Sequence, residues 1–196
     1  MDRQDLQELQ YITPTANVPS ILQRGILSHN RVAALPHDSV AMQEIQELRV
    51  NKAIPNARRL HDYANLYICA RNPMLYKRLD RHAELCVLRI SLNVLDLPGV
   101  IVSDSNAASD YVRFAPAPGG LSIVDRARTF ADDWTSADRI EYYRKKAAKC
   151  AEVLVPDRVD PCHILGAYVS CEGALARFNA LGTGLEAAIN RHTFFF

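Results

Sequence analysis

The residue with the clearest chemical potential is Glu152, which stands near the start of the short apolar run 151–155. An ionised carboxylate is rare inside an apolar strand, because removing its charge from water is costly unless that charge is paired or used. Since strand side chains alternate between two faces, Glu152 could instead point outward from a half-exposed edge strand. The sequence therefore marks Glu152 as a candidate catalytic carboxylate and leaves the simpler alternative open.

Arg49 is a second candidate, because it belongs to a segment with helical periodicity, residues 40–51. Gln46 and Arg49 lie three positions apart and so share one face of that helix. The planar guanidinium of Arg49 is suited to binding phosphate. His37 and Asp38 precede the helix and complete this polar group. A surface arginine on an amphipathic helix is the alternative interpretation.

Two further segments combine polar and aromatic side chains. In the first, the hydroxyls of Tyr11 and Thr13 stand at a strand end, where they could hydrogen-bond an amide or a ribose, while Asn17 and Ser20 could simply cap the next helix. The second, residues 60–76, brackets a strand with loops rich in Tyr, Arg and Asn. Such loops are typical of nucleic-acid sites, where aromatic faces stack on bases, although these tyrosines could equally lie at the boundary of the core.

Positive charge is concentrated in places, although the net charge is only +1. Basic residues gather in the segments 49–59, 71–81 and 139–149, whereas acidic residues gather at the N-terminus and around Asp132. Each cluster alone is typical of a solvated face. Together they predict a positive groove, because the local field matters more to a polyanion than the net charge does.

Length and composition predict one domain that spans residues 1–196, with a hydrophobic content of 48% that is ordinary for a globular protein. We expect neither a signal peptide nor a membrane-spanning run. The five cysteines include no CxxC pair, which favours free thiols in a cytoplasmic protein. No cluster has the spacing of metal ligands, so no metal is expected.

The elements that must position these residues are mixed in order. The expected strands cover residues 9–13, 66–69, 85–90, 100–103, 151–155 and 164–169. The expected helices cover 18–24, 40–51, 106–112 and 135–149, with Gly25 ending the first and a loop at 115–120. Because helices and strands do not alternate regularly and no GxGxxG or GKS/GKT motif is present, the predicted class is α+β with a mixed or largely antiparallel sheet.

An ordered series of motifs resembles the DarT family from about residue 9 to about residue 170. It begins with Tyr11-Ile12-Thr13 and continues through 17–22, 25–30, 37–38, 45–49, 60–63, 71–76, 105–108 and 151–156. The resemblance implies an ADP-ribosyltransferase fold, in which a split mixed sheet and its helices surround a central NAD cleft. It also implies a toxin that transfers ADP-ribose from NAD to a base of single-stranded DNA, blocking replication, with a macrodomain-type antitoxin that reverses the transfer.

The resemblance also implies roles for individual residues. Glu152 matches the catalytic glutamate, and Arg49 matches the arginine of the NAD-binding element. The positions at which the family touches NAD correspond to Tyr11, Ile12, Thr13, Ser20 and Ser28. The segment 105–152 corresponds to the region in which the family recognises its substrate.

One residue departs from the family pattern, since members of the family carry a histidine where this chain has Tyr11. A tyrosine can still stack and donate a hydrogen bond through its hydroxyl, so NAD binding is retained in principle. The family includes thymine-modifying and guanine-modifying branches, and the change favours guanine here.

A mechanism follows from these assignments. Cleavage of the bond between nicotinamide and ribose builds positive charge at the anomeric carbon, which a fixed carboxylate such as Glu152 stabilises. Arg49 stays protonated, so we expect it to clamp phosphate and orient the donor, with proton transfer by a buried arginine beside the base as the alternative. A target base must be unstacked to be reached, which favours single-stranded DNA, with Arg71, Tyr76 and Lys77 as candidate contacts.

Two other functions remain open on the sequence. One is an ADP-ribosyltransferase that acts on RNA or protein, because basic clusters do not distinguish DNA from RNA. The other is a non-catalytic module that binds nucleotides or single strands. The presence of both Arg49 and Glu152 argues against the second alternative.

Overall fold

The computed structural model describes residues 1–33, 35, 37 and 43–196 of the chain. Asp38 and residues 40–42 of the predicted helix lie outside the described residues. The strands are β1 Leu9–Pro14, β2 Ile26–Leu27, β3 Tyr63–Tyr67, β4 Leu85–Ile90, β5 Ile101–Ser103, β6 Phe114–Pro116, β7 Glu152–Pro156, β8 Arg158–Val159, β9 Ile164–Val169 and β10 Ala187–Ile189. The α-helices are α1 Val18–Arg24, α2 His29–Val32, α3 Gln43–Val50, α4 Pro73–Tyr76, α5 Arg126–Thr129, α6 Arg139–Ala148 and α7 Glu172–Asn179.

The central sheet is mixed and split. Its eight strands follow the order β10-β9-β4-β1-β3-β7-β5-β6, and β2 and β8 form a separate pair. Strands β10 and β9 are parallel, whereas the other neighbours are antiparallel. Strand β1 pairs with β4 along its whole length, but its ladder with β3 consists of the pair Gln10–Tyr67. The two strands diverge beyond that pair, which confirms the split mixed sheet expected from the sequence.

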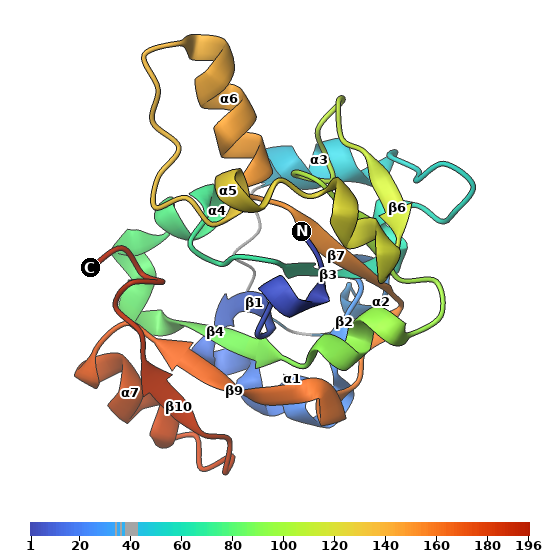
Figure 1. Ribbon diagram of the computed structural model, residues 1–196. Coiled ribbons are helices and arrows are strands. Elements are labelled where there is room, and N and C mark those ends of the chain that lie inside the picture. Colours follow the sequence, from blue (N-terminus) through green and yellow to red (C-terminus); the bar gives the residue numbers. More distant parts are fainter. Residues whose placement is uncertain (34, 36, 38–42) are drawn as a thin grey trace.

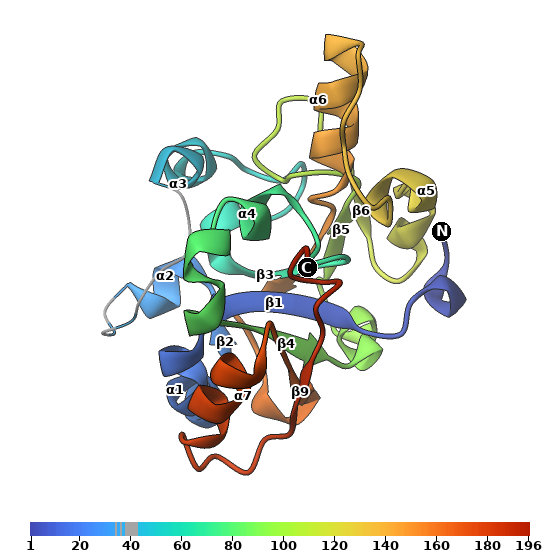
Figure 2. The same cartoon turned by 90° about the vertical axis from the view of Figure 1, so that its left-hand side faces the viewer.

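Helices lie on both sides of this sheet. Figures 1 and 2 show α1 and α7 on one side of β1 and α3, α4 and α6 on the other. Successive side chains of β4 enter opposite clusters, with Leu88 in the larger one and Val87 in the smaller one, as the period of a strand requires. Phe194, from the apolar C-terminal run, is fully buried in the smaller cluster. No described helix is long and apolar enough to cross a membrane.

The predicted helix at 106–112 is wrong, because polar side chains there bond the backbone in turns. The Asp104 carboxylate accepts from the backbone N–H of Arg113 at 3.0 Å and from its Nε at 2.6 Å. Asn106 Oδ1 accepts from the backbone N–H of Ala108 at 2.9 Å. This segment is therefore a loop beside the sheet, and these hydrogen bonds fix its conformation.

Other boundaries differ for similar local reasons. Helix α6 starts later than predicted, because the Asp138 side chain caps it by accepting from the backbone N–H of Ile140 at 2.8 Å. Asn17 does not cap α1 and instead donates to Thr13 Oγ1 at 3.4 Å. Strand β3 begins earlier than predicted, and β6 forms in the predicted loop, where a proline is tolerated at the sheet edge.

Candidate functional site

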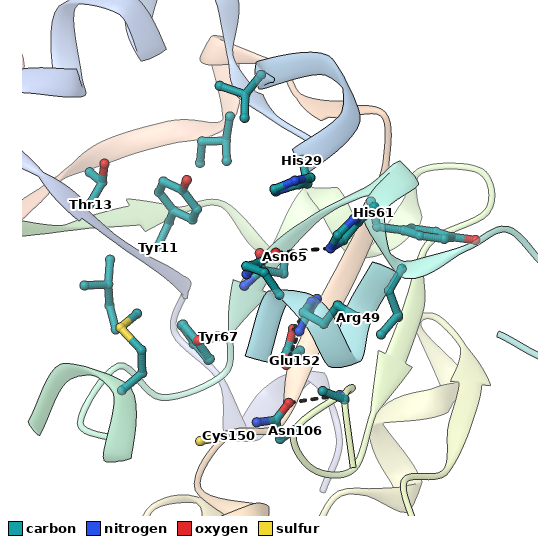
Figure 3. Close-up of a pocket in the computed structure, with 18 of the residues that line it drawn as sticks. Tyr11, Thr13, His29, Arg49, His61, Asn65, Tyr67, Asn106, Cys150 and Glu152 are labelled. Atoms are coloured by element: carbon teal, nitrogen blue, oxygen red, sulfur yellow. Dashed lines mark hydrogen bonds and ion pairs between the residues drawn. The ribbon is translucent and has the colours of Figure 1, made fainter. Parts of the chain in front are cut away.

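A cavity of about 510 Å³ opens where β1 and β3 diverge. Residues 11–14 of β1 line one wall, and Tyr63, Asn65 and Tyr67 of β3 line the facing wall. Helices α1, α2, α3, α4 and α6 contribute further residues, as do β2, the segments 60–61 and 106–109, and the start of β7. Figure 3 shows Arg49 and Glu152 pointing toward each other within the cavity. The split in the sheet therefore creates the space, because two strands that stop pairing leave room for a ligand between them.

Glu152 and Arg49 form a buried ion pair at the floor of this cavity. Arg49 Nη1 lies 3.2 Å from both carboxylate oxygens of Glu152, and Nη2 lies 3.2 Å from Oε2. The backbone N–H of Ala107 also donates to Glu152 Oε1 at 3.1 Å. Only 8% of the Arg49 side chain and 2% of the Glu152 side chain are exposed. The outward-facing alternative for Glu152 is therefore wrong.

The position of Glu152 within the sheet explains its fixed orientation. It begins β7, which lies between β3 and β5, and its register partners are Tyr67 on β3 and Ser103 on β5. The Ser103 hydroxyl accepts from the backbone N–H of Glu152 at 3.2 Å. Because neighbours hold the strand on both sides, the carboxylate is placed by the sheet itself.

Burial and charge determine the ionisation of the lining groups. Burial lowers the pKa of Arg49, but the charge and hydrogen bonds of Glu152 outweigh this and raise it overall. Burial raises the pKa of Tyr67 well above its usual range, with a further rise from Glu152. Burial likewise raises the pKa values of Tyr11 and Cys150 to about 12 each. In the cavity the ion pair of Arg49 and Glu152 therefore lies near the neutral hydroxyl and thiol groups of Tyr11, Tyr67 and Cys150.

Two histidines from different elements stack beside this pair. The rings of His29 and His61 lie 4.1 Å apart at an angle of 28°. His61 Nε2 lies 3.1 Å from Gln46 Oε1, one helical turn before Arg49. Burial, His29 and Arg49 together lower the pKa of His61 to about 4. The stack therefore supports the helix that carries Arg49 while both rings are neutral.

We expect acid to weaken the fold through His61. Its folded pKa lies below the ordinary value of 6.5, so between about pH 6.5 and about pH 4 the unfolded chain binds the extra proton. Stability should then fall as the pH falls through that window, by at most about 3 kcal/mol. Urea unfolding across the window measures the slope. His61→Asn should make the free energy of unfolding less dependent on pH, whereas His163→Asn, at a residue outside the cavity lining, should leave this dependence unchanged. The same pH dependence in both variants and the unmodified protein would contradict the expectation.

Most of the predicted NAD-contacting residues line this one cavity. Tyr11, Ile12, Thr13 and Ser20 all do so, together with Arg49. Ser28 does not belong to the lining and is only 1% exposed, with a hydroxyl that has no hydrogen-bond partner among the described residues. It lies directly behind the lining, between Leu27 and His29. Its contact with NAD stays a prediction.

The three predicted DNA contacts occupy different positions. Lys77 lines the cavity, whereas Tyr76 is 53% exposed outside the lining and packs edge-to-face on Trp134. Arg71 donates to the carbonyl oxygens of Asp132 and His192 and lies 4.2 Å from the centre of the Phe195 ring. Its guanidinium therefore holds two chain segments together, and a role in DNA binding stays a prediction.

Sequence reasoning missed the stacked pair of His29 and His61. The two residues are far apart in the chain, and neither spacing nor periodicity links them. It also took Cys150 as an ordinary buried thiol, although Cys150 lines the cavity, and it offered Tyr67 only within the nucleic-acid-binding segment 60–76. The described residues contain no group of His, Cys, Asp or Glu that could hold a metal ion.

Comparison with known proteins gives the family. A family model described as "ssDNA thymidine ADP-ribosyltransferase, DarT" matches residues 10–195. A DNA ADP-ribosyl transferase–DNA ADP-ribosyl glycohydrolase fusion protein of Thermosipho africanus is 30% identical over 97% of this chain, which spans only 50% of that protein. A DNA ADP-ribosyl transferase of Thermus sp. strain 2.9 is 38% identical over 72% of each chain.

Solved structures agree with the fold. Thermosipho africanus DarTG in complex with ADP-ribose superimposes with a TM-score of 0.83 at 28% identity, over 97% of this chain and 52% of that one. Thermus sp. 2.9 DarT in complex with ADP-ribosylated ssDNA gives a TM-score of 0.84 at 22% identity, over 99% of both chains. With a family model that spans almost the whole sequence, this chain belongs to the DarT family.

Proposed function

We propose that this chain uses NAD to place ADP-ribose on a base of single-stranded DNA and releases nicotinamide. The observation that carries the proposal is the buried ion pair of Arg49 and Glu152 on the floor of the cavity. Membership of the DarT family supports it, as does the relative from Thermus sp. that is described as a DNA ADP-ribosyl transferase. Residues 1–196 act as one ADP-ribosyltransferase domain.

The cavity suits NAD in size and chemistry. Its volume of about 510 Å³ falls within the usual range for small-molecule sites, about 300–1,000 Å³. Tyr11, Thr13 and Ser20 offer hydroxyls for amide and ribose groups, and Ile12 adds apolar contact. Arg49 gives a dinucleotide's phosphates a cation in a buried position. These residues, with Ser28 behind them, form the proposed NAD site.

Glu152 supplies the electrostatic part of catalysis. When the bond between nicotinamide and ribose breaks, its electron pair leaves with nicotinamide and positive charge develops at the anomeric carbon. A carboxylate fixed by the sheet and shielded from water stabilises that charge more strongly than a solvated one. When a phosphate of NAD binds Arg49, the guanidinium interacts with two anions. Glu152 then interacts less strongly with Arg49 and more strongly with the positive charge on the ribose.

Arg49 serves as a clamp and an orienting group. Its pKa is raised, so it holds its proton and is poorly suited to take one from the acceptor base. The base nitrogen that attacks the anomeric carbon loses its own proton to solvent as the new bond forms, so the products are the adduct, nicotinamide and one proton. Arg49 instead fixes the donor, so that the attacking nitrogen and the anomeric carbon meet in one orientation.

The acceptor is a base that can leave the stack, which favours single-stranded DNA over duplex. Two bases are candidates. Guanine is favoured by Tyr11, which replaces the histidine of the family pattern. Thymine is favoured by the description of the matching family model, which names thymidine. Lys77 at the cavity, with Tyr76 and Arg71 nearby in sequence, supplies the proposed contacts to the strand.

A biological role follows from this chemistry. A bulky adduct on a template base blocks replication, so the chain acts as a toxin in the cytoplasm and requires a partner that removes ADP-ribose. The Thermosipho africanus relative joins a DNA ADP-ribosyl transferase to a DNA ADP-ribosyl glycohydrolase, and this chain spans about half of it. The proposed partner is therefore a macrodomain-type glycohydrolase antitoxin.

Mass spectrometry of oligonucleotides tests the proposal. Single-stranded DNA that contains all four bases is incubated with the protein and NAD, beside matched RNA, a protein acceptor and a reaction without acceptor. We expect one ADP-ribose adduct on a single base of the DNA, and fragmentation identifies that base as guanine or thymine. An adduct found only on RNA or only on protein would mean that this molecule, and not DNA, is the acceptor. No NAD consumption under any condition would indicate a non-catalytic binding module.

A further inference from the structure

Helix α6 carries an aromatic and cationic surface at the edge of the proposed active site. The helix projects from the body of the molecule, as Figures 1 and 2 show, and its C-terminal end leads through residues 149–151 into Glu152. Tyr143, Lys146 and Ala147 of this helix line the cavity. The helix therefore links the outer surface directly to the catalytic strand.

Tyr143 is the exposed centre of this surface. It is 54% exposed, and the edge of the neighbouring Tyr142 ring meets it with centroids 5.3 Å apart. The Arg139 guanidinium lies 5.8 Å from the centre of the Tyr143 ring, and Lys146 Nζ lies 5.4 Å from that of Tyr142. An aromatic ring with cations beside it is the combination with which proteins bind single strands, because the ring stacks on a base and the cation meets a phosphate.

The base of the helix is held firmly. Lys149, fully buried, donates through Nζ to the carbonyl oxygens of Thr129 at 3.0 Å and Ala131 at 2.6 Å. Arg71 Nε donates to the carbonyl oxygen of Asp132 at 3.1 Å. These cations fix the segment that leads into α6. A ring on an anchored helix loses little conformational freedom when a base stacks on it, which favours binding.

Charge identifies the kind of partner. Helix α6 contains the cations Arg139, Arg144, Lys145 and Lys146 and one acid, Glu141, which is already paired with Arg128 at 3.1 Å. Lys77, directly after α4, also lines the cavity, so cations from two parts of the chain border the opening. A flat aromatic ring beside Arg139 and Lys146, neither of which forms an ion pair with a carboxylate in the part of the chain that the structure describes, fits a polyanion with planar bases better than it fits an acidic or apolar protein surface.

We propose that Tyr143 is a stacking position for a base next to the modified base, with Lys146 and Arg139 meeting the adjoining phosphates. This inference rests on the proposed function and extends it, because it assigns a second nucleotide of the strand to a named surface. Tyr143 does not touch the reacting atoms. It determines how the single strand is held, and thereby which base reaches Glu152.

Binding of fluorescent single-stranded DNA to matched variants tests the inference. Tyr143→Ala should weaken binding about tenfold or more, whereas Tyr143→Phe, which keeps the ring, should stay within about twofold of the unmodified protein. Phe196→Ala is the control, because Phe196 is 63% exposed and lies outside both the cavity lining and segment 105–152. NAD affinity measured without DNA should be the same in all of these proteins.

An abasic substitution isolates the stacking contact. Replacing either neighbour of the modified base by an abasic residue should weaken binding to the unmodified protein at one of the two positions. At that position the abasic residue should cause no further loss of DNA affinity in Tyr143→Ala, because this variant lacks the ring on which the base stacks. Additive losses at both positions, or unchanged binding in Tyr143→Ala, would overturn the inference. If the unmodified protein fails to bind and modify single-stranded DNA, the proposed function itself is wrong.

Discussion

Glu152→Gln is expected to lower the rate of ADP-ribose transfer by about 1,000-fold while the protein still folds. The substitution keeps the shape of the side chain, so Arg49 and the backbone N–H of Ala107 retain an oxygen as their acceptor. It removes the negative charge that is proposed to stabilise the anomeric carbon. NAD binding should persist, because the proposed contacts through Tyr11, Thr13 and Ser20 are unchanged.

A second buried carboxylate supplies the control for this experiment. Glu8 is 8% exposed and pairs with Arg89 at 2.6 Å, but it lies outside the cavity lining. Glu8→Gln therefore removes a buried carboxylate from an arginine pair without touching the site, although Arg89 itself is 37% exposed. The transfer rate of Glu8→Gln should remain close to that of the unmodified protein. Single-turnover transfer to DNA measures both variants. Activity of Glu152→Gln within about tenfold of normal would remove Glu152 from catalysis.

Breaking the buried pair from one side should cost about 3–5 kcal/mol of stability, because the remaining charge is left without a partner in a poorly solvated place. Glu152→Ala leaves the charge of Arg49 without its partner, and Arg49→Met does the same to the charge of Glu152. Read from the sequence alone, Glu152 is an isolated strand carboxylate whose loss leaves the fold intact. The bidentate contact with Arg49 shows that the carboxylate is not isolated, and for this reason we expect its loss to lower the free energy of unfolding.

The double substitution separates charge pairing from packing. Arg49→Met combined with Glu152→Leu removes both charges and fills the space with apolar groups, so it should lose much less stability than the sum of the single changes. Urea unfolding gives the free energies, and NAD titration of Arg49→Met should also show weaker binding. Additive losses of stability in the double variant would mean that the two residues contribute independently.

The sequence predicted the two charged residues of the site but not their contact. Glu152 stood out as a carboxylate in an apolar run, and Arg49 as a cation at helical spacing from Gln46. Their pairing joins residues 103 positions apart and depends on α3 lying over the start of β7, which no local pattern encodes. The stack of His29 on His61 escaped prediction for the same reason.

Local patterns succeeded where burial and backbone geometry agreed. Strand β4, Leu85–Ile90, is apolar at five of its six positions and was predicted to the residue, because a central strand is buried on both faces. Helix α1 was equally clear, since Gly25 adopts φ +86° at its end. The helix predicted at 106–112 failed because periodicity does not reveal that Asp104 binds Arg113 across the turn.

The register of β5 and β7 has an evolutionary consequence. Ser103 and Glu152 are direct partners in the ladder, so both ends of the intervening segment 104–151, which includes β6, α6 and Tyr143, are held at one rung of the sheet. Closing a long loop at a fixed base costs little more than closing a shorter one. This segment can therefore diverge, or be exchanged between relatives, as a cassette. The proposed contacts of Tyr143 with the acceptor can change in this way while Arg49 and residues 11–13, which lie outside the segment, stay the same.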